Sequence, residues 1–316
     1  MQFADIRGNG TSCLVLTLGT DPLRHQFYDF TGGVKPHLLI GIDNHRGAVT
    51  RIRYAPSTQF YLADRRAGQP WISRLPFPVQ LVEKTERIDL IAKTKQVSRF
   101  AYHHGAYDFV EREFAGFGLV ERWDSEGFEQ FSTTSLLAEA PFELLPSDLH
   151  APPIHTKTWY HTGLRARDGV LSRQYAEDYY SGDRRAYDLP DSSFERAGDG
   201  ESLQVAYRAL RGKVLREEIY GEDTNNPLSE HPYRVSETAY RLRFMQPTQA
   251  GHNSVYLPMV RERLTTHYER NPDDPRVLHE FKLAYDDFGR LTRQARVAYG
   301  RRDRVLVDHP DQSQIQ

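Results

Sequence analysis

The eight residues YDDFGRLT, 285–292, decide the interpretation of this chain. They lie inside a hydrophobic run from Phe281 to Tyr299. The pattern predicts a strand that ends in Tyr-Asp, a turn and then a second strand, because glycine tolerates the positive φ that such a turn requires. We therefore expect a structural turn motif made of Tyr285, Asp286, Gly289, Arg290 and Leu291.

The composition favours sheets with partly wet faces. The chain has 316 residues, with 18 Tyr and 16 Phe but only 3 Met, and tyrosine combines an apolar body with a polar tip. A net charge of −2 gives no electrostatic reason to bind nucleic acid or anionic lipid. Cys13 is the single cysteine, which excludes an intramolecular disulfide and a cysteine-based metal cluster. No apolar run is long enough to span a membrane, so we expect no direct membrane insertion.

The N-terminal residues 1–34 resemble a remnant of one propeller-type repeat followed by a linker. A polar Gly-Asn-Gly loop precedes a predicted strand, Cys13–Thr17, in the manner of FG-GAP repeats. Such loops often bind calcium, and Asp5 is present, but Arg7 occupies the next ligand position and supplies no oxygen. A plain turn is therefore the favoured interpretation. The first five residues lack the basic and apolar segments of a Sec signal peptide, and none is expected.

Residues 35–124 read as a first β-rich segment. Alternation predicts a hairpin of strands 37–42 and 49–54, with Pro56 ending the second strand. A further strand pair is predicted at 79–91 and 96–103. Another strand follows at 107–123, interrupted by two glycines that mark bends.

Residues 125–212 read as a proline-rich insertion with two short helices, at 170–180 and 202–210. A second β-rich segment follows at 213–307, and 308–316 is a polar tail. Its predicted strands are 214–220, 233–244, 255–259, 264–270, 277–285 and 291–299. The fold class expected is mainly β: a large, curved, open antiparallel sheet with a small helical insertion packed at one edge.

Residues that often carry chemistry show no catalytic pattern, and we expect no enzyme, metal site or cofactor. His103-His104 and the histidines at 150, 155 and 161 cluster only in sequence, while a metal needs converging ligands. Glu217 and Glu218 are adjacent on a strand and point to opposite faces. Glu111 and Glu113 share a face, where cross-strand arginines would relieve their repulsion. Cys13, Ser57 and Ser73 lack the context of a nucleophile.

The turn motif resembles the YD repeat of Rhs proteins, which build sheets that wrap into hollow shells. Further motifs occur in one order along the chain: KPHLL 35–39, YAPST 54–58, RLPFP 74–78, YHHG 102–105, EREFAGFG 111–118, LRG 210–212, YERNP 268–272 and AYGRR 298–302. Together they resemble the middle region of the B component of insecticidal toxin complexes (TcB, TcdB-like), which is related to the SpvB N-terminal region. The ordered set is more specific than any single motif.

This resemblance implies a structural wall segment of an Rhs-type cocoon that encloses a toxin domain. The implied partners are the remainder of the B component, a C component carrying the toxin and, indirectly, the pore-forming A component. Such a complex acts outside the producing cell. The alternative is a carbohydrate-binding or carbohydrate-processing β-protein, in which an exposed Trp71, Trp123 or Trp159 lines a groove beside paired carboxylates.

Overall fold

The computed structural model describes residues 1–19, 24–137, 150–164, 169–195, 203–223, 226–249 and 252–302. Its main feature is a 12-stranded sheet in the order β15-β14-β13-β12-β11-β9-β8-β7-β6-β5-β4, with β10 beside β12. The path does not return to its start, and the strand pairs with a defined register are antiparallel except for the short β10–β12 pair. The predicted fold class, mainly β with a large open antiparallel sheet, is therefore confirmed. The chain divides into two compact units, residues 1–107 with 122–153, and residues 108–121 with 154–316.

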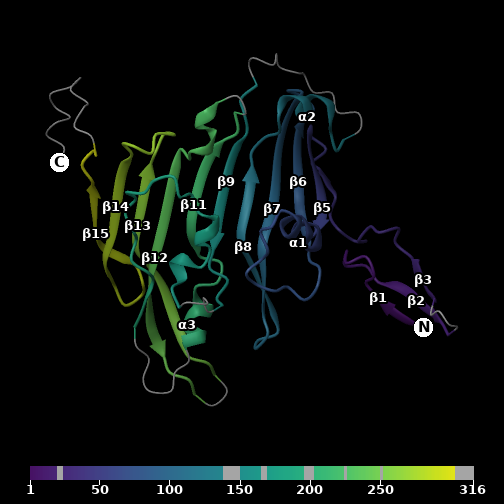
Figure 1. Ribbon diagram of the computed structural model, residues 1–316, viewed down its shortest axis with the longest axis horizontal. Coiled ribbons are helices and arrows are strands. Elements are labelled where there is room, and N and C mark those ends of the chain that lie inside the picture. The colour runs from purple at the N-terminus through teal and green to yellow at the C-terminus, as the bar shows by residue number, and fades with distance from the viewer. Residues whose placement is uncertain are drawn as a thin grey trace. The chain divides into compact units, whose positions relative to one another are not determined.

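The first unit contains two sets of strands. A small sheet has the order β1-β2-β3, and β4 to β7 follow one another as antiparallel neighbours (Figure 1). Two helices, α1 and α2, belong to the same unit. The bounds are β1 Gln2–Ala4, β2 Cys13–Leu18, β3 Arg24–Asp29, β4 Gly41–Asp43, β5 Ala48–Pro56, α1 Ser57–Arg66, β6 Gln80–Asp89, β7 Thr94–Asp108 and α2 Phe128–Thr133.

Pro56 ends strand β5, as expected, and helix α1, which was not predicted, begins directly after it. Pro56 pairs with Gln80 as the last residue of β5 and lies at the N-cap of α1. Proline is well tolerated at a helix start, because the first helical N–H groups have no partner within the helix. Ser57 then fixes the start, since its hydroxyl accepts a hydrogen bond from Val79 N at 3.0 Å. The predicted strand at 37–42 is also shorter, beginning only at Gly41.

The second unit contains the long neighbouring strands β12 and β13 (Figure 1). Strand β13 is continuous where two strands were predicted, because its register with β12 holds along its whole length apart from two irregularities. The bounds are β8 Glu113–Trp123, β9 Ile154–Tyr160, β10 Ser193–Phe194, α3 Leu203–Ala209, β11 Val214–Gly221, β12 Arg234–Gln246, β13 Val255–His267, β14 Arg276–Tyr285 and β15 Leu291–Ala298. Short 3-10 helices lie at Leu171–Arg173, Ala176–Asp178 and Pro227–Glu230.

Of the two helices predicted for the insertion, one is confirmed and one is wrong. The prediction at 202–210 corresponds to α3. Residues 170–180 form two separate 3-10 turns instead of one α-helix. Helix α3 packs on a sheet face, against buried Tyr240, Leu242 and Tyr256, and not at an edge as expected. Among the described residues, no helix is long and apolar enough to cross a membrane.

Candidate functional site

The YD turn joins β14 to β15 and is held by its aspartate. The Asp286 carboxylate accepts hydrogen bonds from the backbone N–H of Phe288 at 3.0 Å and of Arg290 at 2.8 Å, and pairs with the Arg290 guanidinium at 3.0 Å. Gly289 has φ +76°, in the region that glycine occupies at little cost. A Cβ at this position would lie 2.9 Å from Leu257 Cδ2. The turn thus has both a backbone and a packing reason to contain glycine.

The tyrosine of the same motif ties the hairpin to the next strand. Tyr285 donates its hydroxyl hydrogen to Val260 O on β13 at 2.5 Å. Burial raises the pKa of this phenol, which therefore stays a donor at neutral pH. Leu291, the last residue of the motif, pairs with Tyr285 at the start of β15. The five motif residues therefore lie together in one turn.

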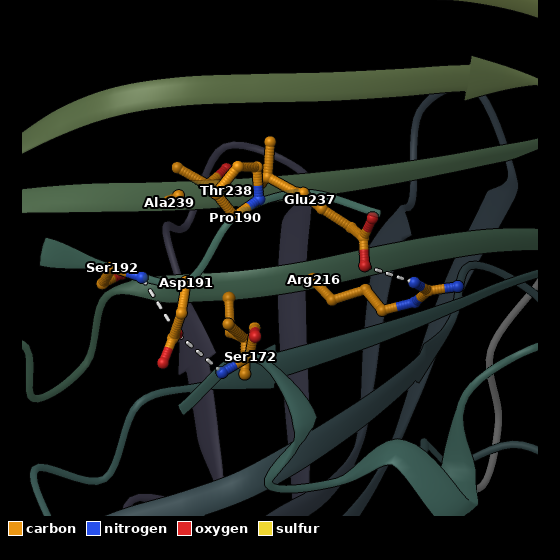
Figure 2. A pocket seen from close by; sticks show the side chains of 10 residues that line it. Ser172, Pro190, Asp191, Ser192, Arg216, Glu237, Thr238 and Ala239 are labelled. Atoms are coloured by element: carbon orange, nitrogen blue, oxygen red, sulfur yellow. Dashed lines mark hydrogen bonds and ion pairs between the residues drawn. The ribbon is translucent and has the colours of Figure 1, made fainter. Parts of the chain in front are cut away.

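A segment that we call the strap, residues 169–194, covers one face of the second unit's sheet. The Asp191 carboxylate accepts hydrogen bonds from the backbone N–H groups of Ser172 and Ser192, at 3.0 and 2.9 Å (Figure 2), and from that of Leu171 at 2.9 Å. The Ser192 hydroxyl in turn accepts a hydrogen bond from the backbone N–H of Tyr240, on β12, at 2.9 Å. Because these bonds satisfy polar backbone groups of the strap and of the sheet, irregular chain can be packed on this face.

The strap is also anchored on a fully buried carboxylate, Glu218 of β11. Glu218 accepts the backbone N–H of Tyr180 at 3.0 Å and the hydroxyl of Tyr220 at 2.6 Å. Its counter-ion Arg216 lies at 2.7 Å and also bonds Glu237 of β12 at 2.6 Å (Figure 2). Tyr179 of the strap lies 4.6 Å from the Arg216 guanidinium. A buried charge of this kind is stable only when it is paired and hydrogen-bonded.

The electrostatics of this cluster follow from burial and pairing. Burial acts to lower the pKa of Arg216, but the adjacent carboxylates Glu218 and Glu237 outweigh it, so the pKa is raised and the guanidinium stays charged. Burial, with Glu218 beside the ring, raises the pKa of Tyr220. Tyr220 is therefore a permanent donor to Glu218. The paired charges and hydrogen bonds give the cluster the character of a structural anchor.

A second ion pair joins the strap to the chain just beyond β15. Both Nη atoms of Arg302 donate to the nearly buried Asp183, at 2.8 and 2.7 Å. Arg302 also donates to the backbone oxygens of Pro272 and Arg185. Burial acts to raise the pKa of Asp183, but the bonds from Arg302 outweigh it and lower the pKa below its usual value. This pair links positions 119 residues apart in sequence.

The first unit contains a comparable anchor around Lys84. The ammonium group contacts Glu86 at 2.9 Å and Glu126 at 2.8 Å, and all three side chains are buried. The Glu86 carboxylate also accepts hydrogen bonds from the Ser135 hydroxyl at 3.0 Å and from the backbone N–H of Leu136 at 2.7 Å. Residues 126–136, which include α2, are thereby held on strands β6 and β7. Burial lowers the pKa of nearby Lys95, whose ammonium donates to carbonyl oxygens of this segment.

The histidines at 103 and 104 and Asp5, which the sequence analysis considered as possible metal ligands, make hydrogen bonds within the fold. His103 Nδ1 lies 2.7 Å from Asp64, and His104, at φ +56°, accepts Ile72 N at 3.2 Å. Asp5 accepts the backbone N–H groups of Asn9 and Gly10, as in a plain turn. In the part of the chain that the structure describes, no three His, Cys, Asp or Glu side chains converge as they would around a metal.

The two glutamate pairs differ in how well they were predicted. Glu218 is buried, whereas Glu217 pairs with Arg234 at 2.7 Å on the opposite face, as the alternation predicted. For Glu111 and Glu113, the prediction that arginines on a neighbouring strand pair with them is wrong. Their partners are Arg208 of α3 and Arg211 just after it, because α3 approaches the end of the β7–β8 hairpin.

The three tryptophans pack inside their own units. Trp159 is fully buried and meets the Tyr179 ring edge at 5.1 Å. Trp71 donates to Asp64 at 2.6 Å, and Trp123 lies beneath the Arg99 guanidinium at 5.5 Å. Trp159 is thereby removed from any sugar-binding surface. The carbohydrate alternative consequently loses the fully buried member of its proposed aromatic set.

Comparison with known protein families identifies the class. Two family models of the insecticide toxin TcdB match: its middle/N-terminal region over residues 1–139 and its middle/C-terminal region over residues 205–316. The chain belongs to this family, and the resemblance seen in the sequence is confirmed. It corresponds to a middle region of a TcB-like B component of insecticidal toxin complexes.

Solved structures agree along almost the whole chain. The Tc holotoxin pore of Photorhabdus luminescens is 32% identical, with a TM-score of 0.78. A TcdB2-TccC3 structure is 32% identical with a TM-score of 0.77, and a TcdB2-TccC3-Cdc42 structure is 33% identical with a TM-score of 0.77. Each match covers 98% of this chain but only 14 to 15% of the solved chain. No curated protein sequence matches.

Proposed function

We propose that this chain is a non-catalytic wall segment of a shell that encloses a toxin domain in an insecticidal toxin complex. The observation that carries the proposal is the match over 98% of the chain to structures of TcdB2-TccC3 complexes. The large antiparallel sheet supports it, because a long sheet with a covered face suits a container wall. The buried ion clusters support it as well, since each anchors irregular chain on a sheet.

The proposed partners follow from the same comparison. The remainder of a B component and a C component of the TccC3 type would complete the shell, and the pore-forming A component would meet it indirectly. The complex would act extracellularly. Within the wall we propose the division made from the sequence: residues 1–34 as a propeller remnant and linker, 35–124 and 213–307 as shell segments, 125–212 as an insertion and 308–316 as a tail.

Co-expression with a TccC3-type C component tests this function. The chain should co-purify with the C component, and the toxin domain should be digested more slowly by added protease than in the C component alone. Two separately eluting proteins, with a toxin domain digested at the same rate in both samples, would refute the proposal. Glycan-array binding by the chain alone would favour the carbohydrate alternative instead.

A further inference from the structure

Three arginines of the second unit's sheet lie beyond ion-pair distance of every carboxylate that the structure describes. They are Arg241 and Arg243 of β12 and Arg263 of β13. Arg234, also on β12, shows the contrast, because its guanidinium lies 2.7 Å from the Glu217 carboxylate. A guanidinium stays charged at physiological pH, so these three arginines carry positive charges that the described part of the chain leaves uncompensated.

Arg241 and Arg243 project from the sheet face opposite to helix α3. Tyr240 and Leu242, their neighbours on β12, are buried in the cluster that includes α3 residues. Successive side chains of a strand point to opposite faces, so the two arginines point away from α3. Both are partly exposed.

Neutral acceptors hold two of the three guanidinium groups in place. Arg243 Nη1 donates to the backbone oxygen of Asp286 in the YD turn at 2.9 Å, and Arg263 Nε donates to Thr238 Oγ1 at 3.4 Å. Thr238 follows Glu237, whose carboxylate lies on the strap face, so the exposed Arg263 shares the face of the other two. Each bond uses one of five N–H donors and supplies no negative charge. We call these three residues the arginine patch.

The arginine patch lies on interior strands. Strand β12 has β13 on one side and β11 with the short β10 on the other, while β13 lies between β12 and β14. The backbone ladders of β12 and β13 are therefore paired with described neighbours. A partner meets this part of the sheet through its side chains and not by adding a strand.

The spacing of the patch favours an extended acidic peptide as its ligand. Arg241 and Arg243 are two residues apart on one strand, which separates their Cα atoms by about 6.6 Å. Acidic residues at alternate positions of an extended peptide have the same separation and also share one face. Guanidinium and carboxylate groups form charge-assisted, often bidentate, hydrogen bonds. A segment of this kind would compensate both charges at once.

We propose that the arginine patch binds an extended acidic segment of the C component. Carboxylates at alternate positions of that segment pair with Arg241 and Arg243, and a further carboxylate pairs with Arg263. The occupant is the C component because it is the polypeptide that completes and fills the proposed shell. The inference rests on the proposed function and adds the sheet face and the chemistry by which the two components recognise each other.

Removal of one charge tests the recognition. Arg241→Gln should weaken binding of a TccC3-type C component about tenfold in biolayer interferometry, whereas Arg241→Lys should keep most of the affinity. The matched control is Arg234→Gln, on the same strand and face, where an exposed pair with Glu217 is lost and binding should change by less than about twofold. Equal weakening by Arg241→Gln and Arg234→Gln would contradict the inference.

The stability of the free chain separates recognition from a structural role. Arg241→Gln removes a positive charge beside Arg243, and like charges on neighbouring positions repel each other. Its urea midpoint should therefore equal or exceed that of the wild type. A lower midpoint would show that Arg241 stabilises the fold, and the assignment of its charge to a partner would be wrong.

Carbodiimide cross-linking identifies the occupant. This reagent joins an amine to a carboxylate in direct contact, so the amine introduced by Arg241→Lys reports which carboxylate faces it. In the co-purified complex, mass spectrometry should find the new amide on an Asp or Glu of the C component. A link to a second copy or to this chain's own carboxylates would overturn the inference, as would a complex without a link, and each leaves the proposed function intact. If the wild type forms no complex, both fail.

Discussion

The two units solve the same packing problem with different counter-ions. Each holds an irregular segment on its sheet through one fully buried carboxylate, Glu86 in the first unit and Glu218 in the second. In the first, the ammonium of Lys84 is shared between Glu86 and Glu126, and Glu126 itself belongs to the attached segment. In the second, both carboxylates that contact Arg216 belong to the sheet.

The two anchors should differ in how much stability each loses when one charged group is removed. A guanidinium is planar and binds two carboxylates along fixed directions while its face receives an aromatic ring, as Tyr179 does at Arg216. An ammonium group is compact and can turn toward whichever carboxylate remains. We therefore expect the second unit to tolerate loss of its buried glutamate less well than the first.

The largest effect is expected for Glu218→Ala. It removes the counter-ion of Arg216 and the acceptor for Tyr180 N and Tyr220 Oη together, so the free energy of unfolding of the second unit should fall by about 3–5 kcal/mol. Urea unfolding followed by hydrogen exchange resolves the two units. A loss below about 1 kcal/mol would show that Glu237 and water suffice for Arg216.

The stability of the second unit should also decrease at acidic pH. Burial lowers the pKa of His161 from 6.5 to about 4, so between these values the unfolded chain binds a proton that the folded chain does not. The contribution of His161 to the free energy of unfolding is complete above pH 6.5 and decreases toward pH 4, by about 3 kcal/mol in total. Comparing unfolding midpoints of the wild type and His161→Phe at several pH values isolates this slope. If the unfolding midpoints of the two proteins changed with pH in the same way, His161 would not be the source of the slope.

A smaller effect is expected for Glu86→Ala in the first unit. Lys84 keeps Glu126, and the loss is mainly that of the acceptor for Leu136 N and Ser135 Oγ, which should cost about 2 kcal/mol. The measurement is the urea midpoint of the first unit, with Glu218→Ala as its counterpart. A loss equal to or larger than that of Glu218→Ala would reverse the comparison between the two anchors.

The smallest effect is expected at the YD turn, which lies outside both anchors. Gly289→Val places a branched side chain at positive φ and against Leu257, and should destabilise the β14–β15 hairpin by on the order of 1–2 kcal/mol. Gly300→Val is the matched control, because no heavy atom lies within 4 Å of a Cβ built there. Equal hydrogen-exchange rates at 278–298 in the two variants would mean that the turn does not set the hairpin's stability.

The local sequence pattern was sufficient to predict the structure where residues close in sequence are also in contact in the fold. The end of β14 at Tyr285 and the start of β15 at Leu291 follow from a two-residue period and a glycine. Alternation also places Glu217 and Glu218 on opposite faces. It does not reveal which face is covered, because the covering strap is irregular chain with no period of its own.

Helical spacing misled the prediction at 170–180 for the same reason. Leu171, Tyr175 and Tyr179 recur every four residues, and the first two are buried while Tyr179 lies against Trp159 and Arg216. Leu171 belongs to one 3-10 turn, however, and the two tyrosines flank another. Tertiary contacts have overridden the local pattern. The arginine partners of Glu111 and Glu113 lie about a hundred residues away, and no local signal could have found them.

The bond between Asp183 and Arg302 has a consequence for synthesis on the ribosome. The strap leaves the exit tunnel before strands β11 to β15, yet its last anchor arrives 119 residues later. Domains emerge from the ribosome N-terminal end first, at about 5–20 residues per second. For several seconds, therefore, the nascent strap has strands β8 and β9 of its sheet but lacks its final salt bridge, which can form only after Arg302 has been synthesised.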